Sequence, residues 1–183
     1  MNESILKAFE NIEKTAQTDL PKPSKSLEGV NKGSEVPFYR QIKDIVDSGY
    51  SEKVIESIQS PEELQLYKDL GLRESEVNGR TVLVRDDIDP NMKDQFGMTN
   101  VERTKEGKAA LGNDGAPTEL HHIGQRHDSP LAELTQTEHR KYYSDLHSSL
   151  VKKSDIDRSL FDTERMNHWE ERSKDFEKGV ING

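Results

Sequence analysis

The sequence predicts an α+β domain with an additional helical segment at the amino terminus. Apolar residues recur at intervals of three and four in several stretches, which is typical of amphipathic helices. Asn78-Gly79 precedes the β-branched and apolar run 81–84, and this combination is the strongest short signal for a β-hairpin. A second candidate strand, residues 118–123, ends in a pair of adjacent histidines. Helices and strands are therefore expected within one domain.

The amino-terminal region separates from the rest by composition. Residues 4–17 carry Ile5, Phe9 and Ile12 at helical spacing, which predicts a short amphipathic helix. Residues 19–37 are rich in Pro, Gly, Ser and Lys, as in linkers. We therefore expect residues 1–36 to be a helix with a linker and residues 37–183 to form the folded domain.

The first part of that domain reads as short helices. Apolar stripes predict helices over residues 37–48 and 51–59. Ser60-Pro61 is a capping residue followed by a proline that fits the first helical position, so another helix should begin there. Gly71 should end this helix.

The second part alternates strand, turn and helix signals. Asn113-Asp114-Gly115 marks a turn before the strand 118–123. Residues 135–138 (TQTE) have the spacing of a capping box, so a helix is expected to begin at Gln136. A later, heavily charged helix is expected at about 155–178.

Composition excludes several classes of protein. The chain of 183 residues has no cysteine, so a metal would have to be held by imidazole, carboxylate or water. No apolar run approaches the roughly 18 residues of a membrane span, so none is expected. The formal net charge of −9 argues against a general nucleic-acid binder. However, residues 103–141 hold six acids and six bases, so this region is neutral.

Five of the six histidines lie within residues 119–147, which is the most informative feature of the sequence. At the end of a strand, the side chains of His121 and His122 could serve one site from two sides. One imidazole could bind a metal while the other activates water, because neutral histidine is both a ligand and a base near neutral pH. A histidine pair, a hairpin and a helix with His139 and His147 follow the spacing of a ββα-metal nuclease.

The interval of eight residues between His139 and His147 leaves the ligand set open. In an unbroken helix these residues are about 12 Å apart along the axis and about 80° apart around it, which is too far for one ion. Either His139 precedes the regular helix, or the segment breaks near Ser144, or only one of the two binds. Asp128 and Glu138 are possible substitutes.

These motifs resemble a known family. The stretch "ELHHIGQ", followed by "SPLAELT", "EH" and "LH", resembles the LHH branch of the HNH/endonuclease VII nuclease superfamily. The resemblance covers about residues 65–150, including "GLRESEVNGRTVLVRDDID" and "GMTNVERTKEGKAALGNDG", and extends into the tail 156–176. It implies a ββα-metal (HNH, or His-Me finger) core at about 97–150 with surrounding helices.

The resemblance also implies roles for individual residues. His121 matches the metal-ligand position and His122 the general base, while His139 and His147 match the remaining ligand positions. One divalent ion, Mg²⁺, Mn²⁺, Zn²⁺ or Ni²⁺, would be bound. The remaining assignments concern residues that would contact nucleic acid: Arg103, as a catalytic phosphate clamp, and Asn100, Arg126 and Arg140.

Members of this family are typically C-terminal toxin domains of bacterial polymorphic toxins. The resemblance therefore implies an endonuclease toxin that cuts DNA with little sequence preference, acts in the cytoplasm of a target cell after delivery from the producing bacterium, and has a cognate immunity protein. Three alternatives stay open: an RNase of the same fold, a metal-stabilised binding module without catalysis, and an interaction protein with an acidic surface. With DNA as the substrate, positive potential should be confined to the cleft and affinity should fall with salt.

Overall fold

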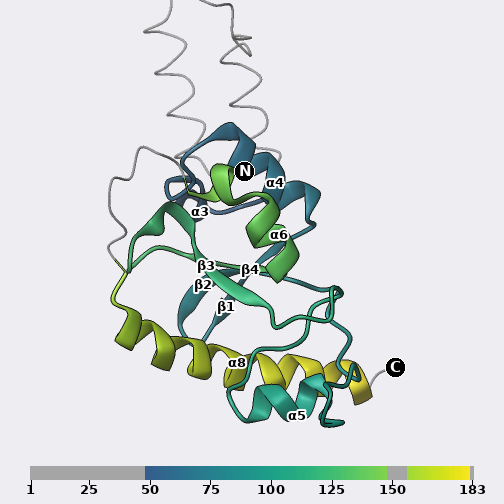
Figure 1. The fold of residues 1–183 in the computed structure, drawn as a ribbon. Coiled ribbons are helices and arrows are strands. Elements are labelled where there is room, and N and C mark those ends of the chain that lie inside the picture. Colours follow the sequence, from purple (N-terminus) through teal and green to yellow (C-terminus); the bar gives the residue numbers. More distant parts are fainter. Residues whose placement is uncertain (1–47, 148–155, 182–183) are drawn as a thin grey trace, which may run out of the picture. The chain divides into compact units, whose positions relative to one another are not determined.

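The computed structural model describes residues 48–147 and 156–181, all of which belong to one compact unit. The helices expected at 4–17 and 37–48, the linker and the domain boundary after residue 36 lie outside the described residues. Within them, the chain has the predicted α+β fold, with a small sheet and several helices (Figure 1).

The elements follow the chain in an alternating order. The helices are α3 (Glu52–Ile55), α4 (Pro61–Asp69), α5 (Asn100–Lys105), α6 (Gln136–Lys141), α7 (Tyr143–Leu146) and α8 (Arg158–Ile181). The strands are β1 (Arg73–Val77), β2 (Arg80–Val84), β3 (Glu119–His122) and β4 (Leu131–Leu134), and a 3-10 turn (Ile123–Gln125) follows β3.

The four strands form one sheet in the order β1-β2-β4-β3. Strands β1 and β2 are an antiparallel hairpin, β2 runs parallel to β4, and β3 pairs antiparallel with β4. The chain continues from β4 into α6, so β3, β4 and α6 form the strand–strand–helix unit expected from the histidine spacing.

Helices cover both faces of the sheet (Figure 1): α3, α4 and α6 lie on one side, and α8 lies with α5 on the other. Each face has its own apolar core. The core under α4 and α7 includes Tyr67, Leu83, Ala132, Leu134 and Leu146. The core under α8 includes Val82, Val84, Leu131, Trp169 and Phe176. Alternate residues of β2 and β4 therefore point into different cores, as expected for a sheet covered on both sides.

Several local predictions are confirmed. The Ser60 side chain accepts a hydrogen bond from the Glu63 amide, and Pro61 begins α4. Asn78 and Gly79 have φ values of 50° and 75°, the positive values that a tight two-residue hairpin requires. The last helix is observed at Arg158–Ile181 rather than about 155–178.

A buried charge network joins α8 to the sheet. Glu133 of β4 is completely buried, and its Oε1 lies 2.9 Å from His168 Nε2 and 2.8 Å from Arg172 Nε. The other oxygen accepts a hydrogen bond from the Arg85 amide at 2.9 Å. Because buried ions are stable only when paired, these contacts determine how α8 sits on the sheet.

Candidate metal centre

Strand β3 sends its two histidines to opposite faces of the sheet. His121 pairs with Ala132 and His122 with Leu131, so the β3–β4 ladder continues without a bulge through both residues. Ala132 belongs to the core under α4 and α7, whereas Leu131 belongs to the core under α8. The two side chains therefore do not serve one site from two sides of the strand end, because antiparallel pairing maintains the alternation of side chains.

The helix after β4 breaks between the two later histidines. Thr135 caps α6 in a capping box with Glu138, as predicted. The helix ends at Tyr142, whose φ of −102° and ψ of 22° are not helical, and the short α7 follows. His147 lies just beyond α7. The break, two residues before the expected position at Ser144, allows His139 and His147 to approach each other.

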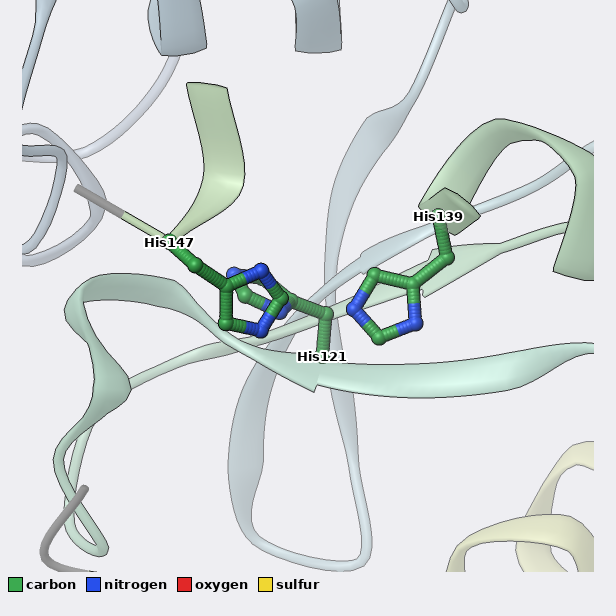
Figure 2. A group of neighbouring side chains, drawn as sticks. All are labelled: His121, His139 and His147. Atoms are coloured by element: carbon green, nitrogen blue, oxygen red, sulfur yellow. The ribbon is translucent and has the colours of Figure 1, made fainter. Parts of the chain in front are cut away.

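His121, His139 and His147 form a three-histidine cluster (Figure 2). One nitrogen of each ring lies within 4.8 Å of a nitrogen of both others. The ring centroids of His121 and His139 are 5.2 Å apart, those of His121 and His147 are 5.1 Å apart, and those of His139 and His147 are 5.2 Å apart. The rings come from β3, α6 and the end of α7, and Figure 2 shows them turned toward one another.

The hydrogen bonds of this cluster leave ring nitrogens available for a ligand. His139 Nδ1 lies 2.5 Å from Glu119 Oε2, and His147 Nδ1 lies 3.1 Å from the carbonyl oxygen of Tyr143. The Nε2 atoms of His121 and His139 are buried and have no hydrogen-bond partner. Buried polar atoms are normally satisfied, and metal-binding histidines commonly donate their second nitrogen to a carboxylate or carbonyl group. The cluster therefore fits a divalent metal ion.

The environment keeps two of these imidazoles neutral. Burial lowers the pKa of His121 well below 6.5, and the neighbouring His139 and His147 lower it further. Burial also lowers the pKa of His147, assisted by His139. Because only neutral imidazole can donate its lone pair to a metal, both rings are in the ligating form at pH 7.

Residues 99–175 match one family model. The model is LHH, described as a nuclease of the HNH/ENDO VII superfamily with conserved LHH. In this chain Leu120, His121 and His122 supply those three letters, and the matched region contains all three histidines of the cluster. The match begins later than the expected residue 65 and includes most of α8. No solved structure matches the chain.

His122 of the LHH motif lies apart from the three-histidine cluster, on the α8 side of the sheet. Its side chain is 1% exposed, and its ring centroid is 4.5 Å from that of Phe161. Its Nε2 has no hydrogen-bond partner and lies 3.6 Å from Glu164 Oε2. The structure therefore separates the two members of the pair, and the general-base role of His122 stays a prediction.

Asn100 and Arg103 bond to other groups of the same domain. Asn100 is fully buried, and its amide bonds to the backbone of Asp89 and Leu111. The Arg103 guanidinium pairs with Asp94 at 2.6 Å and bonds to a backbone carbonyl. Both residues belong to α5, which packs against α8 on the side of the sheet opposite α6 (Figure 1). Their polar groups therefore hold loops together in this structure, and the contacts of both residues with nucleic acid stay a prediction.

The other sequence candidates lie outside the three-histidine cluster. Arg126 and Arg140 are exposed, so both stay candidates for phosphate contacts. Glu138 pairs with Arg85 at 2.5 Å, and Asp128 lies near Arg126. Neither carboxylate belongs to the three-histidine cluster, so neither is needed to replace a histidine as the third metal ligand.

Glu119 contacts the three-histidine cluster, and the sequence analysis did not include it. It precedes His121 by two positions on β3 and therefore points to the same face. The spacing of two residues on a strand could have indicated that Glu119 lies beside His121. The sequence does not indicate that the partner of Glu119 is His139, which is 20 residues away.

Replacing Glu119 by glutamine should weaken metal binding about ten- to a hundredfold, because His139 loses the charged group that orients its ring. Isothermal titration of the full chain with Zn²⁺ measures the effect. Glu106→Gln removes the same charge at an exposed position and is the matched control. Equal Zn²⁺ affinities for Glu119→Gln and the wild type would exclude this role.

Proposed function

We propose that the chain is a metal-dependent endonuclease that hydrolyses DNA phosphodiester bonds and acts as a bacterial toxin. The observation that carries the proposal is the cluster of three imidazoles, with unpartnered nitrogens on His121 and His139, inside a region that matches a nuclease family model. We propose one divalent ion at this site, Mg²⁺, Mn²⁺, Zn²⁺ or Ni²⁺. Imidazole nitrogens suit Zn²⁺ and Ni²⁺, whereas Mg²⁺ and Mn²⁺ prefer oxygen ligands such as water and phosphate.

In the proposed reaction, the three-histidine cluster would bind the metal ion that activates the phosphate. His121, His139 and His147 would hold the ion, and Glu119 and the Tyr143 carbonyl orient two of these rings. A divalent ion held there would polarise a phosphate oxygen and stabilise the negative charge of the transition state. The exposed Arg126 and Arg140 would attract the phosphate backbone, and that attraction would weaken as salt rises.

The resemblance makes His122 our candidate for the general base, a role that requires its ring, on the α8 side of the sheet, to reach a water molecule beside the three-histidine cluster. Burial lowers its pKa to about 4, with contributions from Arg80 and His127, so the ring is neutral at pH 7 and can accept a proton. Its buried Nε2 lacks a partner, which is uncommon for a purely structural histidine. Arg80 pairs with Glu164, and this carboxylate lies beside the His122 ring.

Replacing His122 by alanine tests this role. A general base contributes about a hundred- to ten-thousandfold, so the cutting rate should fall by that factor while Zn²⁺ affinity stays at the wild-type value. Single-turnover cutting of labelled DNA and calorimetric metal titration are the two measurements. A variant that cuts normally, and differs only by a lower melting temperature, would make His122 a structural partner of Phe161 and Glu164.

Plasmid cutting with each metal supplied separately tests the activity. We expect nicked and linear products that are absent with a chelator. Parallel digestion of total RNA decides between DNA and RNA as the substrate. A chelator that lowers thermal stability while no nucleic acid is cut under any condition would favour the metal-stabilised binding module instead.

The toxin role is a separate part of the proposal. It rests on the resemblance of the LHH region to toxin domains and predicts delivery from a producing bacterium into the cytoplasm of a target cell. Such a producer needs an immunity protein that binds this domain. Induction of the chain in a bacterial cytoplasm should stop growth and degrade DNA, and harmless expression of a chain that cuts DNA in vitro would contradict the toxin role.

Within the described residues, no helix has the length and hydropathy to cross a membrane.

A further inference from the structure

An exposed aromatic ring lies directly beside the three-histidine cluster. Tyr143 opens α7, and its ring centroid is 4.2 Å from that of His147 with an angle of 16° between the planes. The two rings are therefore stacked nearly face to face. Tyr143 is nevertheless 61% exposed, so the contact with the imidazole covers only part of it.

The exposed part of this ring is an apolar surface beside the three-histidine cluster. The stacked imidazole occupies one face of the Tyr143 ring, so the second face is the part that a ligand can still cover. Orientation of His147 does not require the ring, since the Tyr143 backbone carbonyl already bonds to His147 Nδ1. The ring thus has a free flat surface next to a candidate metal ligand.

The surroundings favour a nucleic-acid strand as the ligand. The last turn of α6, just before Tyr143, contains Arg140 and Lys141, so it carries two positive charges in a chain with a net charge of −9. Flat aromatic rings combined with positive charge are the usual elements of single-strand binding sites, in which bases stack on the rings. In a regular duplex, both faces of each internal base are already covered by neighbouring bases.

We propose that Tyr143 stacks an unpaired base of the substrate strand next to the phosphate held at the three-histidine cluster. This inference rests on the proposed nuclease function and specifies its substrate as single-stranded or locally unwound nucleic acid. Tyr143 is then a positioning residue, because it holds a base while the neighbouring groups act on the backbone.

Binding without cutting tests the inference. The full chain is freed of metal with a chelator and titrated into a labelled oligothymidylate or a blunt hairpin duplex with the same number of phosphates. Tyr143→Leu keeps an apolar side chain but removes the flat ring, and should weaken oligothymidylate binding about ten- to a hundredfold. Tyr143→Phe should bind like the wild type. Phe96→Leu, at a position that is 82% exposed in a loop before α5, is the matched control.

Three results would overturn the inference. The first is unchanged oligothymidylate binding by Tyr143→Leu, and the second is an equal loss for the duplex. The third is a wild-type chain that binds neither probe. A Zn²⁺ titration of Tyr143→Leu is a further measurement, and its Zn²⁺ affinity should match that of the wild type. A parallel loss of Zn²⁺ and oligothymidylate binding would show that the ring only positions His147, and this result would also overturn the inference. Failure of the proposed function is distinguishable, since it appears as no cutting with any metal, whatever the binding results.

Discussion

His121→Ala is expected to abolish metal binding and to reduce DNA cutting at least about a thousandfold, equivalent to roughly 4 kcal/mol of transition-state stabilisation. The reason is its central position: His121 is the buried member of the three-histidine cluster and contacts both other rings. Metal at a hundred times its dissociation constant stabilises a binding protein by about 2.7 kcal/mol. The wild-type chain should therefore melt several degrees higher when metal is added, and the variant should not.

His127→Ala is the matched control for this experiment. His127 is a half-buried histidine of the same segment and lies outside the three-histidine cluster. Its replacement should leave the metal-induced rise in melting temperature intact. Differential scanning calorimetry with and without Zn²⁺ gives the comparison. A His121→Ala chain with the full metal-induced rise would show that the cluster does not bind the ion.

Glu133→Gln is expected to have the largest effect on stability. The carboxylate is completely buried and bonds to His168, Arg172 and the Arg85 amide. Loss of its charge removes the buried partner of the Arg172 guanidinium, which keeps only the half-exposed Asp175 as a charged partner, and breaking such a buried pair costs about 3–5 kcal/mol. Urea denaturation at pH 7 measures the loss. Glu171→Gln is the matched control. It breaks an exposed ion pair with Lys174 of α8, the helix that contains Arg172, and should change the free energy of unfolding by about 0.5 kcal/mol or less.

The same network predicts how stability depends on acid. Burial alone would raise the pKa of Glu133, but the His168 hydrogen bond and the Arg172 charge hold it at about 2. The unfolded chain has a value near 4.3, so this group stabilises the fold above about pH 4.3, and that contribution is lost as pH falls toward 2. The loss should be about 3 kcal/mol in the wild type and absent in Glu133→Gln. Parallel acid slopes for the two chains would contradict this assignment.

Local signals predicted a large part of the described fold. The caps at Ser60 and Thr135 and the positive φ values at Asn78 and Gly79 depend on a few neighbouring residues. A capping side chain or a two-residue turn acts over one helical turn or one hairpin, so a short sequence window contains the necessary information.

The sequence also identified the three-histidine cluster, but not its geometry. The helix break at Tyr142 brings His139 toward His147. It contains neither glycine nor proline, the residues that usually indicate a helix break in a sequence. Asn100 and Arg103 were polar residues in a matching motif, and only the folded chain shows that their groups are already bonded to Leu111 and Asp94.

By itself, the sequence determined the composition of the site: a paired histidine on a strand, two more histidines after a capping box, and no thiolate. Tertiary structure decided which of these groups meet. His121 joins the cluster and His122 faces α8 because the ladder with β4 sets the face of each residue. Glu119 and Glu133 acquire their partners 20 and 35 or more residues away. Pairing register and helix docking are long-range contacts, and no local pattern of residues encodes them.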